Sequence, residues 1–319
     1  MEILTPQSST DDHEKNEALD ERRDHSKYVV KILSYKTREG AHWIATAGWD
    51  GKILLYQLRN RPDSTMLAMG PPVALVSMPT NPEAMVFIKD SDNLAPILVA
   101  TRRDSTSLHY YSLRPVDIAA PSPASPVELD LLGTQNLAPH SNAWIAFTPS
   151  AIALCPTDPN LLAVATSSVP HMKLMIVRLL VPASATQSRN PTLAPTQAAQ
   201  ARENLARQDR EDLAIRINVS TMAPQTPYST PQVCWRPDGS GVWVNGDDGA
   251  LRGIEARTGK IITRLSEGGH EAGSKIRSIW AGLVQPEGEE GKEEEWVVSG
   301  GFDRRLIAWK PEKVDAIEA

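Results

Sequence analysis

The sequence predicts an all-β fold built from repeated units of short strands. The stretch ATAGWDGKILLYQL at 45–58 has a counterpart in VSGGFDRRLIAWK at 298–310. Each combines a strand of small residues, an aspartate in a tight turn and an apolar strand that ends near an aromatic residue. Five segments with this order of features follow one another along the chain, and such internal repetition is typical of repeat architectures.

Each segment contains three strand-like runs rich in Val, Ile, Leu and aromatics, bounded by Gly, Pro, Asp or Asn. In chain order the runs are VVKILSY, HWIATAGWDG and KILLYQL; EAMVFIK, PILVATRRDS and SLHYYSL; SAIALCPTDPN, LLAVATSS and KLMIVRLL; PQVCWRPDGS, GVWVNGDDG and ALRGIEA; KIRSIWAGL, EWVVSGGFD and RRLIAWK. Three further runs, VELDLL, LAIRINVS and GKIITRLS, are placed to add a fourth strand after the second, third and fourth segments.

Three inserts interrupt the repeats, near 114–126, 181–212 and 285–295, and they hold many of the 25 prolines. The longest insert ends in TQAAQARENLARQDRED, which could form a short polar helix. Because this stretch has almost no apolar face, we expect a loop instead. The acidic insert QPEGEEGKEEE is expected to be a solvated hairpin tip, with a docking site for a basic partner as the alternative.

Composition narrows the classes of partner. The chain has 319 residues, 41% hydrophobic and 23% charged, and a net charge of −6. Because the chain is acidic, we do not expect a nucleic acid to be its main partner. A local basic patch that binds one is the alternative. No apolar run reaches the length of a membrane span, and the N-terminal segment lacks the features of a signal peptide. We expect a cytoplasmic or nuclear protein with no membrane partner.

The residues carry no recognisable catalytic signature. P-loop, G-x-G-x-x-G, H-E-x-x-H and CxxC motifs are absent, and the seven histidines are scattered. Cys155 and Cys234 lie in apolar, strand-like contexts, so buried reduced thiols are expected, with a disulfide or a metal site as the alternative. We therefore expect a protein that is not an enzyme and that needs no cofactor or metal.

The repeated segments resemble the WD-repeat β-propeller family. In that family a histidine before the first strand, a Ser or Thr in the second, an Asp in the next turn and a Trp in the third strand hydrogen-bond to one another. The fifth segment matches at every position, with His270, Ser299, Asp303 and Trp309. The first matches nearly, with His25, Thr46, Asp50 and Tyr56. The second keeps Asp104 and the fourth keeps Asp248, whereas the third has no Asp at this position.

The resemblance implies a β-propeller of four-stranded antiparallel blades over 25–310, between a polar segment at 1–24 and a tail at 311–319. Five repeats account for the length once the inserts are removed. The chain is then either a five-bladed ring or part of a seven-bladed one. The run MEIL within 1–5 stands where an outer strand of the last blade is expected, so it could close the ring.

A Ser, a His and an Asp together also suggest a hydrolase, but here the Ser lies inside a strand and the Asp in a hairpin turn. A G-x-S-x-G elbow and a glycine-supported oxyanion hole are missing. A buried Asp needs hydrogen-bond partners, which the His, the hydroxyl and nearby backbone N–H groups supply. We therefore interpret these four side chains as structural.

The resemblance implies a non-catalytic protein–protein interaction scaffold, a subunit of an intracellular multiprotein complex. The alternatives are a substrate-receptor subunit of a ubiquitin ligase or another enzyme complex, and an enzyme or small-ligand-binding propeller. In the family, the residue before the turn Asp points to the top face. Candidate partner-binding residues are therefore Trp49, Arg103, Asp247 and Phe302, with Arg304 and Arg305 beside them. If five blades close, Trp49 and Phe302 become neighbours; the alternative is that each aromatic side chain folds onto its own blade.

Overall fold

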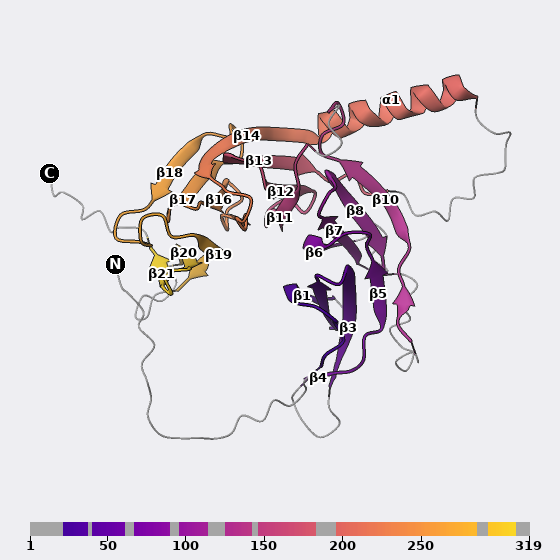
Figure 1. The fold of residues 1–319 in the computed structure, drawn as a ribbon, viewed down its shortest axis with the longest axis horizontal. Helices are drawn as coiled ribbons and strands as arrows, with labels where there is room; N and C mark the ends of the chain where they lie inside the picture. Colours follow the sequence, from indigo (N-terminus) through magenta and orange to yellow (C-terminus); the bar gives the residue numbers. More distant parts are fainter. Residues whose placement is uncertain are drawn as a thin grey trace. The chain divides into compact units, whose positions relative to one another are not determined.

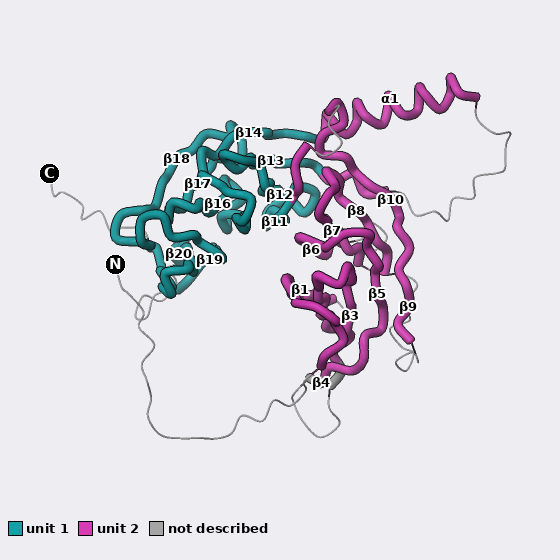
Figure 2. Tube along the Cα trace, viewed as in Figure 1, with its two compact units in different colours: residues 1–9, 150–178, 215–319 teal, residues 10–149, 179–214 magenta. Residues whose placement is uncertain are grey.

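The computed structural model describes residues 22–37, 40–60, 67–89, 96–113, 125–141, 146–182, 196–285 and 293–310. The described part consists of strands apart from one helix, α1 (Figure 1), so the all-β prediction is confirmed. The chain divides into two compact units, 1–9, 150–178 and 215–319 as unit 1, and 10–149 with 179–214 as unit 2 (Figure 2). The expected closing strand at 1–5 lies outside the described residues.

Unit 1 carries the third, fourth and fifth sheets of the chain. The third has the order β11-β12-β13-β14 and the fourth β15-β16-β17-β18, while the described part of the fifth is β19-β20-β21. Their bounds are β11 Pro149–Leu154, β12 Leu161–Thr166, β13 His171–Arg178, β14 Ile215–Pro224, β15 Val233–Trp235, β16 Gly241–Asn245, β17 Leu251–Glu255, β18 Ile261–Leu265, β19 Ile276–Val284, β20 Glu294–Gly301 and β21 Leu306–Trp309. The predicted outer strands LAIRINVS and GKIITRLS correspond to β14 and β18.

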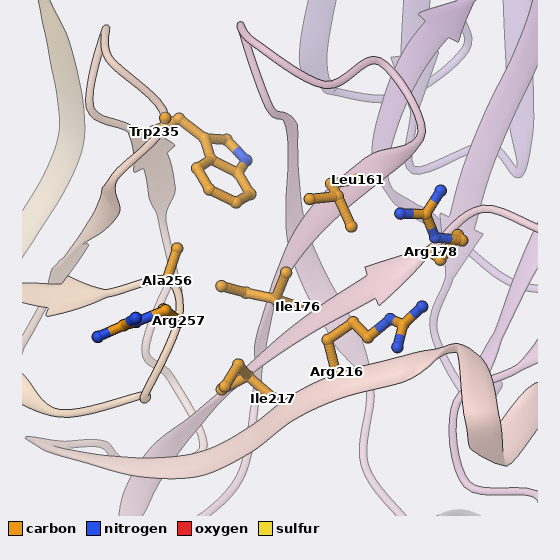
Figure 3. Close-up of a pocket in the computed structure, with 9 residues that line it drawn as sticks. Leu161, Ile176, Arg178, Arg216, Ile217, Trp235, Ala256 and Arg257 are labelled. Atoms are coloured by element: carbon orange, nitrogen blue, oxygen red, sulfur yellow. The ribbon is translucent and has the colours of Figure 1, made fainter.

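The third and fourth sheets of unit 1 pack through one apolar cluster. Fully buried residues of the central strands, such as Ala163 and Leu174, meet Val242 and Ile254 of the fourth sheet. Every residue of β16 is buried, as expected for a strand covered on both faces. Near one end of this interface a cavity of about 320 Å³ opens, lined by side chains of both sheets (Figure 3).

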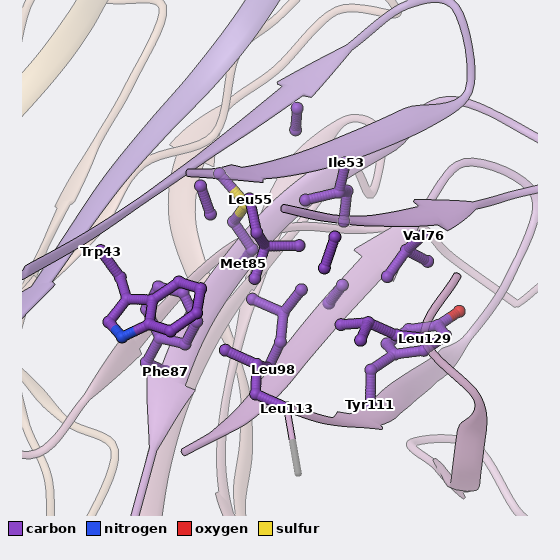
Figure 4. Packing of buried hydrophobic residues seen from close by; sticks show 14 of the residues in the cluster. Trp43, Ile53, Leu55, Val76, Met85, Phe87, Leu98, Tyr111, Leu113 and Leu129 are labelled. Carbon is purple, nitrogen blue, oxygen red and sulfur yellow. The ribbon is translucent and has the colours of Figure 1, made fainter. Parts of the chain in front are cut away.

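Unit 2 carries the first and second sheets. The first has the order β1-β2-β3-β5-β9, with β4 also paired to β3, and the second has the order β10-β8-β7-β6. Their bounds are β1 Val29–Lys36, β2 His42–Gly48, β3 Lys52–Asn60, β4 Leu67–Met69, β5 Ala74–Ser77, β6 Pro82–Ile88, β7 Ile97–Arg102, β8 Ser107–Ser112, β9 Val127–Glu128 and β10 Leu131–Asn136. Trp43, Leu55, Phe87 and Leu98 are among the buried residues that join the two sheets (Figure 4).

The predicted strand VELDLL is divided between the two sheets of unit 2. Its first two residues form β9, which pairs in parallel with β5 of the first sheet. Its last two residues begin β10, the outer strand of the second sheet, which pairs with β8. Leu129 lies between the two strands and is buried in the shared core. The segment therefore links the sheets, which its apolar pattern alone does not reveal.

The second half of the long insert is a helix rather than the loop that we expected. Helix α1 spans Gln197–Ala214, 18 residues. Its composition of Ala, Gln, Arg and Glu has high helix propensity, so an apolar face is not the only source of stability. Thr196 caps its start, since the Thr196 hydroxyl accepts the N–H of Ala199 at 3.3 Å. Near its end the carboxylate of buried Glu211 accepts the N–H of Asn136 in β10 at 3.0 Å.

Candidate functional site

In the fifth sheet four side chains form one hydrogen-bonded network below the turn between β20 and β21. His270 Nδ1 lies 2.9 Å from Asp303 Oδ1, and His270 Nε2 lies 2.9 Å from Ser299 Oγ. Trp309 donates its indole N–H to the same hydroxyl at 3.0 Å. A neutral His270 protonated at Nδ1 satisfies every partner, because it donates to the carboxylate and accepts from the serine.

The first sheet repeats this geometry around Asp50. His25 Nδ1 lies 3.0 Å from Asp50 Oδ1, and His25 Nε2 lies 2.8 Å from Thr46 Oγ1. The third-strand aromatic differs, since the Tyr56 hydroxyl donates to the carboxylate of Asp24 at 3.2 Å. Burial raises the pKa of Tyr56 to about 12, so this hydroxyl remains a donor at neutral pH.

Both turn aspartates are held as carboxylates. Burial alone would raise the pKa of Asp303, but hydrogen bonds from His270 and from the backbone N–H groups of Glu271 and Arg305 outweigh it, and the pKa is lowered. The pKa of Asp50 is lowered in the same way, against burial, chiefly by the hydrogen bond from His25. A carboxylate whose acceptor capacity is filled by its own sheet is suited to fastening a hairpin, not to exchanging protons with a substrate.

Close packing in these networks depends on glycines that the sequence interpretation missed. A Cβ on Gly301 would lie 2.6 Å from both Asp303 Oδ1 and His270 Nδ1, and one on Gly48 would lie 2.6 Å from Asp50 Oδ1. A Cβ on Gly269 would lie 2.6 Å from Cζ2 of Trp309. The signal was present as the repeated pattern Gly-x-Asp, at 48–50, 246–248 and 301–303.

In the fourth sheet Asp248 is paired with arginines instead of a histidine. Its carboxylate accepts from Arg252 at 2.7 Å and from Arg264 at 3.2 Å. Burial acts to raise the pKa of Asp248, whereas the hydrogen bond from Arg252 lowers it, and the net shift is downward. The turn is thus fastened by an ion pair, because Val244 at the hydroxyl position cannot supply a partner.

Asp104 of the second sheet does not join a network of this kind within the described residues. It is exposed, and its backbone has a positive φ of 59°. The turn is aligned with the others, since the N–H of Arg103 donates to the carbonyl of Asn81 as that of Trp49 does to Tyr28. Arg102, however, stands where the other three turns have glycine, so a carboxylate has no room below this turn.

The third sheet has hydroxyls but no turn aspartate. Thr166 Oγ1 lies 2.8 Å from Ser168 Oγ, and it also donates to the backbone carbonyl of Lys173 at 3.2 Å.

Cys155 and Cys234 are free thiols. Burial raises the pKa of Cys234 to about 12, which makes it unreactive at neutral pH. In the described ranges no group of three or more His, Cys, Asp or Glu could hold a metal ion.

Two of the six candidate binding residues are partly exposed aromatics. Trp49 is 43% exposed and meets Tyr28 of its own sheet edge-to-face, with ring centroids 5.8 Å apart. Phe302 is 60% exposed, and the guanidinium of Arg277 lies 4.7 Å above its ring. Each ring is therefore held by one neighbour in its own sheet and still presents surface to solvent. Since Trp49 belongs to unit 2 and Phe302 to unit 1, their expected adjacency stays a prediction.

Three of the four charged candidates form ion pairs with neighbouring residues. Arg103 pairs with Glu83 at 2.9 Å, and Asp247 pairs with Lys275 at 3.0 Å. Arg305 pairs with Glu271 at 3.2 Å. Arg304 is exposed at a positive φ of 63°, one residue after Asp303. Exposed ion pairs contribute little stability, so Arg103 and Arg305 remain able to contact another molecule, whereas only 11% of the Asp247 side chain is exposed.

A family model described as a beta-propeller domain matches residues 138–284. With the repeated His–Asp networks and the meander order of the sheets, this match decides the fold. The chain is a β-propeller. Its five sheets are the blades, and the end of each blade at which the second and third strands meet is called here the Asp-turn end.

Two solved structures are similar to this chain at low sequence identity. The β-propeller domain of Cps50 (Swd1) from Myceliophteria thermophila is 13% identical, with a TM-score of 0.44, covering 92% of this chain and 69% of that chain. A chain of the Chaetomium thermophilum Polycomb Repressive Complex 2, in a humanized mutant, is 11% identical with a TM-score of 0.52. That alignment covers 91% of this chain and 50% of the chain from the Polycomb complex.

The search of curated proteins found no match. In the described part of the propeller, no helix combines the length and apolar character needed to cross a membrane.

Proposed function

We propose that this propeller is a non-catalytic scaffold that binds other proteins through the Asp-turn ends of its blades. One observation carries the proposal: equivalent turns of the first and fifth blades each present an exposed aromatic side chain directly before a buried, fully hydrogen-bonded Asp. Aromatic side chains held on rigid supports lose little conformational entropy on binding and are enriched among interface hot spots.

The adjacent charges suggest the chemistry of the partner. Arg304 and Arg305 follow Phe302 in the same turn. We propose that the first and fifth blades are neighbours in a five-bladed ring, so that Trp49 and Phe302 form one aromatic pair with a basic rim. Such a surface suits a peptide with an apolar anchor and acidic residues. A chain of Polycomb Repressive Complex 2 is a precedent for the fold in a multiprotein complex.

The proposal is tested by affinity purification with quantitative mass spectrometry of the wild type and of a Trp49→Ala/Phe302→Ala variant. We expect the double variant to lose the main co-purifying proteins while its melting temperature changes little, because both rings are partly exposed. Trp280→Ala is the matched control, since Trp280 is 49% exposed but lies in the middle of β19. Partners that the double variant retains in full would overturn the proposal.

The same experiment distinguishes the alternative of a substrate receptor. A scaffold co-purifies with a stable set of subunits. A receptor in a ubiquitin ligase co-purifies with ligase subunits, and its further partners accumulate when proteasomal degradation is blocked.

A further inference from the structure

A second surface of unit 1 lies at the ends of the third and fourth blades that are opposite to their Asp-turn ends. The cavity there is lined by residues from the starts of β12 and β14, the ends of β13 and β15 and two loops of the fourth blade (Figure 3). The lining residues are Leu161, Ile176, Arg178, Arg216, Ile217, Trp235, Gly239, Ala256 and Arg257. All nine fall within 138–284, the stretch that the family model matches.

The floor of the cavity is apolar and firmly built. Trp235 is 5% exposed and Ile176 2%, and the indole N–H of Trp235 donates to the carbonyl of Ala153 at 2.8 Å. Ile217 and Leu161 pack partly buried against the same core cluster. When a partner's side chain covers apolar surface that is exposed beside a rigid core, the burial of that surface favours binding.

Three arginines surround this floor. Arg178 and Arg216 come from the neighbouring strands β13 and β14, and Arg257 lies on the opposite side (Figure 3). The pairing shifts between Ile176↔Ile217 and Val177↔Ile215, so Arg216 is the extra residue of a β-bulge. A bulge redirects side chains, which here places Arg216 and Ile217 at one cavity.

Two of these arginines carry charge that no described residue neutralises. Arg178 pairs with Asp158 at a long 3.7 Å, and 44% of its side chain is exposed. Arg216 and Arg257 are exposed and make no ion pair with another described residue. Positive charge is thus concentrated at one place on a chain whose net charge is −6.

We propose that this cavity binds an acidic segment of a partner protein, with one aliphatic side chain of that segment on the floor and flanking Asp or Glu carboxylates on the arginines. Guanidinium groups bind carboxylates with two parallel hydrogen bonds, and the rigid apolar floor supplies the anchor. A nucleic acid is less suited, because buried Trp235 offers no open face for base stacking and the acidic chain repels a polyanion.

The test is selection of random 12-residue peptides displayed on phage against the full chain, followed by fluorescence anisotropy with the selected peptides. We expect enrichment of Asp and Glu around an aliphatic residue. An Arg216→Glu/Arg257→Glu variant should bind these peptides at least about tenfold more weakly, as for the loss of interface hot spots. The variant Arg216→Lys/Arg257→Lys keeps the charge without the bidentate geometry and should lose less.

Arg202→Glu/Arg207→Glu on α1 is the matched control, since it changes the net charge equally at exposed positions that do not line the cavity. It should bind the peptides within about twofold of the wild type, because a change of net charge alone acts weakly through screening solvent. Replacing the central aliphatic residue of a peptide by serine should weaken binding without altering the protein.

The proposal is overturned if no peptide is selected, if the selected peptides are not acidic, or if Arg216→Glu/Arg257→Glu binds them as the wild type does. Binding of a 12-nucleotide RNA that is tighter than peptide binding and depends equally on the arginines would also overturn it, in favour of a nucleic-acid site.

The inference extends the proposed scaffold function to a second surface. Since Trp49→Ala/Phe302→Ala should leave peptide binding intact, failure of one proposal is distinguishable from failure of the other.

Discussion

Gly301 shows how a single missing side chain allows a whole network to form. It stands two residues before Asp303, and the space that a Cβ would occupy is filled by the carboxylate and by the ring of His270. Both of those side chains are fully buried. At the corresponding place in the second blade, Arg102 replaces the glycine and Asp104 turns to solvent. The Asp is therefore structural only where the preceding glycine makes room for it.

We predict that Gly301→Ala lowers the free energy of unfolding by about 2 kcal/mol, as for other overpacked sites. The neighbouring Gly300→Ala is the control. A Cβ on Gly300 would lie 2.8 Å from Ser278 Oγ, the far end of a side chain that can rotate away. Thermal unfolding followed by circular dichroism measures both. Equal melting temperatures for the two variants would contradict the role given to Gly301.

At the scale of the element, helix α1 shows what an apolar pattern fails to detect. Its exposed surface is mostly polar apart from Leu205 and Leu213, and among its described residues only Glu211 and Ala214 are buried. High intrinsic propensity and the Thr196 cap favour the helix locally. Near its end, the backbone N–H of Asn136 in β10 donates to the carboxylate of Glu211, which fastens the helix to the second blade.

We predict that Glu211→Ala costs about 1–2 kcal/mol, because it leaves the N–H of Asn136 without its acceptor. Hydrogen–deuterium exchange should show faster exchange in 206–214 and in β10. Asp209→Ala, at an exposed position of the same helix, should leave exchange in β10 unchanged. Unaltered protection of β10 in the Glu211 variant would show that the contact does not hold the helix.

At the scale of the whole molecule, the fifth blade differs from the three before it. It has three strands in the described part, whereas the second, third and fourth blades have four each. An unpaired sheet edge exposes backbone N–H and C=O groups and invites aggregation. A strand from 1–5 that completes this blade would connect the two ends of the chain and so close the propeller, as the sequence predicts.

We predict that deletion of residues 1–5 lowers the melting temperature by about 5 °C or more, since a lost blade strand removes several kcal/mol of pairing and packing. Replacing 6–10 by a Gly/Ser segment of equal length is the control and should change little. If the deletion melts at the wild-type temperature, residues 1–5 do not close the ring.

The sequence by itself determined the repeated all-β organisation, because alternating apolar runs, turn residues and the echo between 45–58 and 298–310 are local features. Through the resemblance to WD repeats it also predicted that His25 and Thr46 meet near Asp50, and His270 and Ser299 near Asp303. It did not predict that Tyr56 donates to Asp24 instead of joining the Asp50 network. Tertiary structure alone decided the rest. The arginines of the cavity come from positions up to 79 residues apart, Arg178 and Arg257, and only packing of two blades with a bulge at Arg216 brings them together. The division of VELDLL between two sheets likewise depends on pairing with strands distant in sequence, which no local pattern records.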